Sequence, residues 1–133
     1  MGLIHTTITL KNPNLESFST IDTVALVDTG ALHLCIPEHM ALQLGFDLNT
    51  SMIREVTTAD NKKHICPYVG PIQITFQNRA CFTGALVIGN EVLLGAVPME
   101  DMDLILSPAK QAVIVNPESP NVASSVAKGV VAR

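Results

Sequence analysis

The 133-residue chain contains no tryptophan, and aromatic residues make up only 4% of it. Charged residues are also scarce, at 15%, whereas 47% of the residues are hydrophobic. A chain of this length is expected to form one domain with a modest core, which here must be built from aliphatic side chains. The mean hydropathy of +0.35 is high for so short a chain, so we expect part of the surface to be buried against a partner.

The chain also lacks the features of several protein classes. Its three cysteines are an odd number without C-x-x-C spacing, so no disulfide framework is predicted. No uncharged run approaches the roughly 18 residues that a membrane span needs, and residues 1–10 alternate in polarity, unlike a signal peptide. The net charge of −4, with no basic cluster longer than Lys62-Lys63-His64, argues against nucleic acid as a partner. We therefore expect a cytoplasmic protein with reduced thiols and no membrane association.

Most of the chain has the pattern of short β-strands. Stretches that alternate in polarity or are rich in β-branched residues recur along it, separated by Gly, Pro, Asn and Asp. The expected strands cover residues 3–10, 24–27, 70–76, 80–88, 91–94, 104–107 and 112–115, and residues 34–36 form a short apolar stretch. Two extended stretches between residues 51 and 76 flank A-D-N-K-K, where Asp60-Asn61 is typical of a tight turn, so a long hairpin is expected. The sequence thus predicts a mainly β, barrel-like domain over residues 1–115.

Two short helices and a tail complete the predicted organisation. The stretch P-E-H-M-A-L-Q-L begins with Pro37 and is followed by Gly45, which favours a helix between them. A second helix is expected over residues 98–103, with its three acidic residues in the first turn, where negative side chains stabilise a helix. From residue 116 the pattern dissolves, and we expect residues 116–133 to form a poorly ordered C-terminal tail.

One acidic residue, Asp28, ends the apolar stretch V-A-L-V and opens the turn D-T-G-A. A carboxylate beside a buried strand is costly unless it is hydrogen-bonded, paired or partly neutral. An Asx turn, in which Asp28 binds backbone N–H groups and Gly30 supplies an unusual backbone angle, would account for the tripeptide alone. However, a second apolar-apolar-Gly stretch, L-L-G-A at 93–96, also ends a strand and leads toward a short helix. The long hairpin lies between these two stretches, so their order carries more information than the tripeptide.

This order resembles that of the retropepsin-like aspartic proteases, the single-lobed, retroviral-type family that has bacterial members in clan AA. The family pattern is an apolar stretch, D-[ST]-G-A, a flap hairpin, then apolar-apolar-Gly and a helix, and the similarity extends over roughly residues 3–115. The resemblance implies a closed barrel of short strands with a flap hairpin. It also implies that Leu93-Leu94-Gly95 supports the catalytic loop from the core.

The resemblance implies an aspartic endopeptidase that needs no metal or other cofactor. In aspartic proteases two adjacent carboxylates share one proton, so that the pair can both activate water and protonate the amide. This chain offers one suitable aspartate, Asp28, and is too short for two lobes, so a symmetric homodimer would supply the second carboxylate. Thr29 would link the two active-site loops across the dimer, and the Gly30 carbonyl would accept a substrate N–H.

The resemblance also implies where an extended peptide or protein substrate would bind. Ala31 and Leu32 follow the D-T-G triplet and would lie beside the substrate. Ala59, Asp60 and Asn61 would form the flap tip that closes over it, and the substrate would bind by strand addition.

Two positions depart from the retroviral pattern. Retroviral members carry Asp after D-T-G-A and Arg after the second apolar-apolar-Gly, where this chain has Leu32 and Ala96. Both halves of that ion pair are absent, so no buried charge is left without a partner. The departures motivate an alternative hypothesis, a catalytically inactive peptide-binding or assembly module with the same fold. A third hypothesis is a protease whose residues 116–133 occupy the cleft or are trimmed.

Two rival sites fit the sequence less well. His33, Cys35 and His39 lie close together, but their spacing is not that of a tetrahedral metal site, and we interpret them as a packed thiol and two surface histidines. A catalytic cysteine at Cys66 or Cys81 is also disfavoured. Cys66 lies on a predicted strand, away from a helix start that would lower the pKa of its thiol.

Overall fold

The structure is a computed structural model that describes residues 3–17 and 20–131. These residues form β1 (His5–Lys11), β2 (Ile21–Val27), β3 (Leu34–Ile36), α1 (Glu38–Gln43), β4 (Met52–Thr57), β5 (Lys63–Phe76), β6 (Arg79–Val87), β7 (Val92–Leu94), α2 (Ala96–Asp101), β8 (Leu104–Ser107) and β9 (Ala112–Val115). The prediction of a mainly β domain with two short helices is confirmed. Neither helix is long and apolar enough to cross a membrane.

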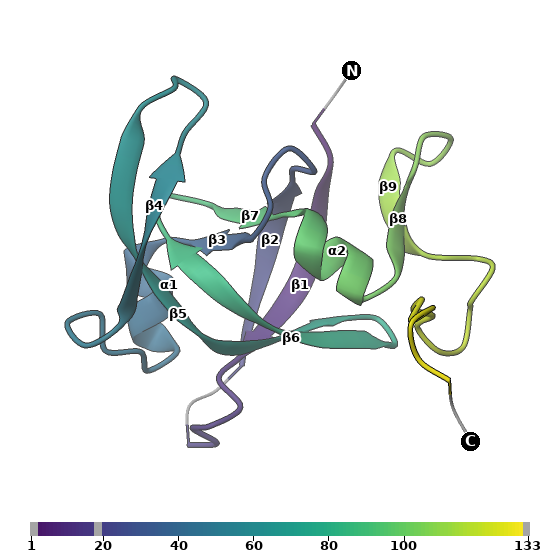
Figure 1. Ribbon diagram of the computed structural model, residues 1–133, viewed down its shortest axis with the longest axis horizontal. Helices are drawn as coiled ribbons and strands as arrows, with labels where there is room; N and C mark the ends of the chain where they lie inside the picture. The colour runs from purple at the N-terminus through teal and green to yellow at the C-terminus, as the bar shows by residue number, and fades with distance from the viewer. Residues whose placement is uncertain (1–2, 18–19, 132–133) are drawn as a thin grey trace.

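Six of the strands form a closed barrel. Their order is β1-β2-β7-β3-β6-β5, and β1 closes the sheet by pairing antiparallel with β5 through residues 9–11 and 73–75. β2 and β7 run parallel, so Asp28 and Gly95, which follow them, leave the barrel at the same end. The expected closed barrel is therefore confirmed, and its topology brings the two apolar-apolar-Gly stretches together (Figure 1).

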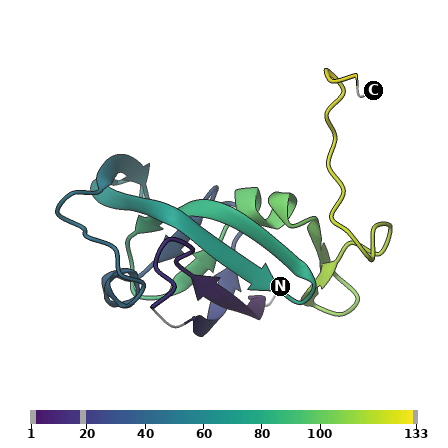
Figure 2. The ribbon, with the colours of Figure 1, turned by 90° about the horizontal axis from the view of Figure 1, so that it is seen from below.

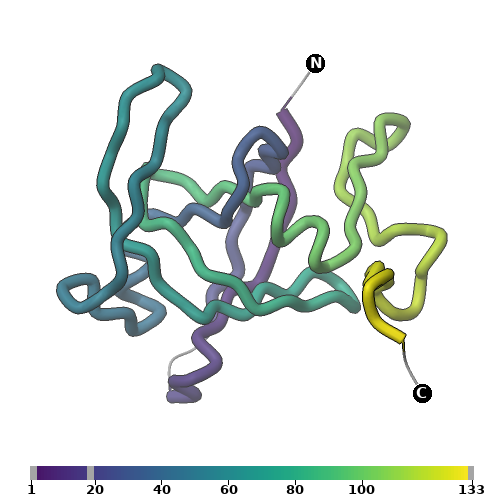
Figure 3. Tube along the Cα trace, in the orientation of Figure 1, coloured from purple at the N-terminus to yellow at the C-terminus, as the bar shows by residue number. Residues whose placement is uncertain are grey.

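The flap hairpin extends from this barrel. β4 pairs antiparallel with the first part of β5 over residues 52–57 and 63–68, and a register shift between Val69 and Ile72 separates that part from the half of β5 that closes the barrel. At the tip, the N–H of Asn61 donates to the carbonyl of Thr58 at 2.9 Å, and Asn61 has a φ of 68°. Asn tolerates this left-handed backbone well, so the turn predicted at Asp60-Asn61 is confirmed. Figure 3 shows the hairpin as the teal loop at the upper left.

The core of the barrel is aliphatic, as the composition predicts. Leu10, Leu34, Ile72, Ile74 and Leu94 are fully buried. Each such side chain contributes about 1.5–3 kcal/mol by leaving water. They come from four of the barrel strands, β1, β3, β5 and β7. Ala25 of β2 is also fully buried, so the core joins the strands that carry the two loops.

The second helix begins two residues earlier than predicted. It covers Ala96–Asp101, with Pro98 as its third residue and no acidic residue in its first turn. Proline is tolerated there because the first N–H groups of a helix have no intrahelical partner. The prediction that the acidic residues occupy the first turn is therefore wrong. Two of them end the helix, and Asp103 lies beyond it.

Asp103 instead holds the chain that follows β9. Its carboxylate accepts hydrogen bonds from the Asn116 side chain at 3.1 Å, the Ser124 N–H at 2.9 Å and the Ser119 hydroxyl. Arg79, only 2% exposed, donates to the Ser119 carbonyl. A separate tail over residues 116–133 stays a prediction, and its first part is held against the body. Residues 125–131 are exposed and extend away from the barrel, as the yellow segment in Figure 2 shows.

Candidate active site

Asp28 begins the loop that follows β2. Its N–H donates to the carbonyl of Leu94 at 3.1 Å, and its carboxylate oxygen Oδ1 accepts the Gly30 N–H at 3.0 Å. The Ala31 N–H returns to the Asp28 carbonyl at 3.1 Å. The Asx turn that the tripeptide favours is therefore present, but the unusual backbone angle expected at Gly30 is not, because Gly30 does not have a positive φ. It uses only part of the acceptor capacity of the carboxylate, which can accept about four hydrogen bonds. The side chain is half-buried, so it remains accessible to a water and to a second carboxylate.

The L-L-G stretch supports this loop from the core, as the resemblance implies. Besides the bond from Asp28 to Leu94, the Ala96 N–H donates to the Ala31 carbonyl at 2.9 Å, and the Val97 N–H donates to the Leu32 carbonyl at 2.9 Å. These bonds fix both ends of the Asp28 loop. They also require a glycine between them, because a Cβ atom at Gly95 would lie 2.4 Å from the carbonyl oxygen of His33.

A cleft of about 610 Å³ separates the Asp28 loop from the flap. Asp28, Gly30 and Ala31 line one wall, and residues 56–59 of the flap line another. Cys35, residues 88–91 and Leu93 complete it. The loop and the flap project from the same side of the barrel, the upper side in Figure 1. An extended chain bound in this cleft would therefore pass beside the Asp28 carboxylate.

The site residues expected from the sequence divide into two groups. Ala59 lines the cleft with the three loop residues already named, and Leu32 lines an adjoining hollow of about 340 Å³. Thr29, Asp60 and Asn61 are exposed and line neither. Asp60 is engaged within its own turn, where the Thr58 hydroxyl and then the Lys62 N–H lower the pKa of its carboxyl group.

Several cleft residues were missed by the sequence analysis. They are Cys35, Val56, Thr57, Thr58, Ile88, Gly89, Asn90 and Glu91. Residues 56–58 immediately precede the predicted flap tip, so extending the predicted flap site by one strand end would have found them. Nothing local in the sequence marks the segment 88–91, because its position depends on the pairing of β6 with β3 and of β7 with β2.

The rival sites are not supported by the described residues. Burial, followed by the charges of Cys66 and Asp28, raises the pKa of the Cys35 thiol to about 11, so it is a packed thiol as predicted. Burial also raises the pKa of Cys66, which opposes the thiolate that a cysteine nucleophile requires. His39 is exposed, and His33 is half-buried at the surface, where it contacts Arg54. Within the ranges 3–17 and 20–131, no cluster of three or more His, Cys, Asp or Glu side chains could hold a metal ion.

Comparisons with known proteins agree with this geometry. A family model described as "Aspartyl protease" matches residues 17–120. Among solved structures, a retropepsin-like aspartic protease from Rickettsia conorii is similar, with a TM-score of 0.51 and 19% sequence identity over 72% of this chain and 68% of that one. A search of the curated proteins finds no match. Since the family model spans most of the chain, including D-T-G-A, the flap and L-L-G, the chain belongs to the aspartyl protease family and has the retropepsin-like fold.

Proposed function

We propose that the protein is an aspartic endopeptidase that acts as a homodimer, with Asp28 of each subunit activating one water molecule. The observation that carries this proposal is the position of Asp28, a half-buried carboxylate on a loop fixed from the core, in the wall of a cleft roofed by a flap. Two such carboxylates in contact cannot both ionise, so the pair shares a proton and can act as base and acid in turn. No cofactor is needed for this reaction.

The surface around the Asp28 loop supports a second copy as the source of the other carboxylate. Thr29 and Gly30 are exposed at the turn. Beside it, Leu32 is 59% exposed and Val97 is 40% exposed, and the Val97 N–H to Leu32 carbonyl bond places their backbones side by side. Large apolar side chains exposed together favour association. A two-fold axis beside Thr29 would cover them and place both Asp28 side chains in one site.

The flap supports an extended peptide as the substrate. In the part of the chain that the structure describes, β4 is the last strand of the sheet and pairs only with β5, so its other edge carries unpaired backbone N–H and C=O groups. Residues 56 and 57 of this strand line the Asp28 cleft. An extended chain could therefore add to the edge of β4 while its scissile bond lies over Asp28.

Cleavage of an unfolded protein substrate by wild type and by Asp28→Asn tests this proposal. Asn keeps an oxygen for the Gly30 N–H and therefore preserves the turn, but it cannot act as the base. We expect a loss of about 100-fold to 10,000-fold in rate, which is typical of a lost general acid–base group. Asp22→Asn is the matched control, because Asp22 is exposed on β2, the strand that leads to Asp28, and its side chain accepts only the Thr9 hydroxyl among the described residues.

The result also separates the enzyme from the alternative function. A transition-state analogue with a hydroxyl in place of the scissile carbonyl should inhibit the wild type. Cleavage that persists in Asp28→Asn would contradict the proposed mechanism. A folded dimer that binds peptides but cleaves none would instead favour the peptide-binding module, which the Leu32 and Ala96 departures motivate.

A further inference from the structure

Three side chains from distant parts of the chain meet at the base of the flap. Arg54 comes from β4, Tyr68 from β5, and His33 from the loop after Asp28. The Arg54 guanidinium carbon lies 4.0 Å from the centre of the Tyr68 ring. Arg54 Nη1 lies 3.3 Å from His33 Nε2, and the rings of His33 and Tyr68 meet edge to face with centres 5.9 Å apart. We call these three residues the arginine cluster.

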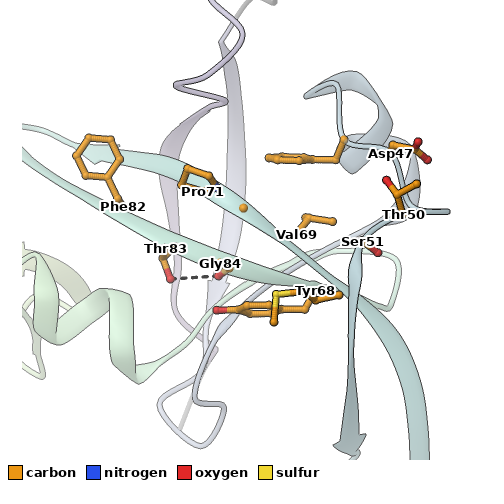
Figure 4. Close-up of a pocket in the computed structure, with 12 residues that line it drawn as sticks. Asp47, Thr50, Ser51, Tyr68, Val69, Pro71, Phe82, Thr83 and Gly84 are labelled. Atoms are coloured by element: carbon orange, nitrogen blue, oxygen red, sulfur yellow. Dashed lines mark hydrogen bonds between the residues drawn. The ribbon is translucent and has the colours of Figure 1, made fainter.

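The arginine cluster holds the guanidinium in one place. A cation over an aromatic face is attracted by the ring, and the planar guanidinium stacks well on it. The Tyr68 ring is itself confined, because it lies against Gly84 of β6, where a Cβ atom would come within 2.1 Å of the tyrosine oxygen (Figure 4). A fixed guanidinium loses little side-chain entropy when it binds a ligand, so Arg54 is prepared for binding.

The guanidinium retains free donors and an uncompensated charge. Arginine is always protonated, so the contact with His33 requires Arg54 to donate and the neutral His33 ring to accept. Burial, and then the Arg54 charge, lower the pKa of His33, which agrees with a neutral ring. Glu55 lies next in the chain, but it pairs with Lys63 at 3.6 Å. Within the described residues, no carboxylate lies within ion-pair distance of Arg54.

The cluster faces the proposed substrate path. Arg54 and His33 line the hollow of about 340 Å³ that adjoins the Asp28 cleft. The walls of the hollow and of the cleft have five residues in common, which are Gly30, Ala31, Cys35, Val56 and Thr57. Arg54 is two residues before Val56 on β4, so both side chains point to the same face of the strand. At about 3.3 Å per residue, an extended chain that passes Asp28 reaches this hollow within a few residues.

We propose that Arg54, positioned by Tyr68 and His33, binds a carboxylate of the substrate, so that the enzyme selects peptides with Asp or Glu a few residues from the scissile bond. This inference rests on the proposed endopeptidase function. Arginine recognises carboxylates through two parallel hydrogen bonds, which add geometric selectivity to the charge attraction. In a symmetric dimer the site occurs twice, so the preference would appear at equal distances on both sides of the scissile bond.

Cleavage profiling with an unbiased peptide library, followed by matched peptides that differ only as Glu or Gln at the selected position, tests the inference. We expect a ratio of kcat/KM for Glu over Gln of about 10 or more, as for a charge-assisted pair. The ratio should approach one in Arg54→Gln. In Arg54→Glu the preference should reverse, so that peptides with Lys at the selected position are cleaved better than those with Glu. Lys62→Gln is the matched control, because it removes a flap cation that lies outside both hollows and leaves the Lys63–Glu55 pair in place, so it should keep the ratio.

Tyr68 provides a second test that separates positioning from charge. Tyr68→Phe keeps the aromatic face and should keep the Glu preference, whereas Tyr68→Leu removes the face and should reduce it. Cleavage without a preference for acidic residues, or a preference that survives in Arg54→Gln, would overturn the inference and leave the endopeptidase intact.

A binding measurement tests the inference without cleavage. The Asp28→Asn variant is titrated with the fluorescent Glu and Gln peptides, and anisotropy reports the two affinities. The carboxylate site is supported if the Glu peptide binds more tightly than the Gln peptide and if this difference is lost in the double variant that also carries Arg54→Gln. This holds even if no peptide is cleaved. Equal binding of the two peptides contradicts it. Absence of cleavage by the wild type, by contrast, counts against the proposed function alone.

Discussion

Gly95→Ala should destabilise the protein by disturbing the hydrogen bonds that hold the Asp28 loop. The φ of Gly95 is −88°, a value that alanine adopts freely, so the substitution has no backbone penalty of its own. Its Cβ atom, however, would lie 2.4 Å from the His33 carbonyl oxygen and 2.8 Å from both the Ala31 carbonyl oxygen and the Leu32 carbonyl carbon. All three atoms belong to the backbone of the loop that begins at Asp28, so the loop must move.

The size of the effect follows from the contacts that this movement breaks. Two hydrogen bonds, Ala96 to Ala31 and Val97 to Leu32, are each 2.9 Å long and join the same two segments. Their loss costs about 1 kcal/mol each. Crowding in a packed region adds about 1–3 kcal/mol. The expected loss in free energy of unfolding is therefore about 3–5 kcal/mol, a large share of the roughly 5–15 kcal/mol that stabilises a domain.

Urea unfolding at a fixed protein concentration measures this loss, and Gly89→Ala provides the comparison. Gly89 has a φ of 80° and nothing within 4 Å of its Cβ position, so alanine there pays only the backbone penalty of about 1–2 kcal/mol. Gly95→Ala should also lower the cleavage rate, because the displaced loop carries Asp28. If Gly95→Ala unfolds at the same urea concentration as Gly89→Ala or wild type, the support of the loop by L-L-G is refuted.

Two further predictions follow from the ionisable groups. Hydrogen bonds from the Ser119 hydroxyl and then the Ser124 N–H lower the pKa of Asp103 to about 2. The stability that Asp103 confers is therefore present above the usual carboxyl pKa of about 4 and is lost as the pH falls toward 2. Asp103→Asn should lower the melting temperature at pH 7 and leave it unchanged below pH 2, and an equal effect at both pH values would contradict this. Burial raises the pKa of the Cys35 thiol to about 11 and of Cys81 to about 12, so both should react with a thiol reagent at pH 8 only after unfolding. Rapid labelling of the native protein, located by mass spectrometry, would contradict that burial.

The sequence predicts the fold well where local chemistry decides it. The flap turn follows from Asp60-Asn61, because asparagine tolerates the left-handed backbone that Asn61 adopts. The strands follow from the alternation of apolar residues. The start of α2 was misplaced because Pro98 is equally acceptable at several positions of a first turn.

The candidate site could be predicted only where a motif marks it. Asp28 and L-L-G carry family patterns, and the structure places them in contact. The arginine cluster has no such pattern, because His33, Arg54 and Tyr68 are brought together by the pairing of distant strands. From the sequence alone His33 is predicted to be a surface residue, because its contact is with Arg54, which lies 21 residues away in the chain.

Mixing wild type with Asp28→Asn tests the central claim most directly, because it asks whether one active site needs two chains. The two forms are co-expressed with different tags so that subunits combine at random, and cleavage is measured at constant total protein. If each site requires Asp28 from both subunits, an equal mixture retains about one quarter of the wild-type activity, since only a quarter of the dimers carry two aspartates. Activity of about one half would mean that each chain acts alone, and would contradict the shared carboxylate pair.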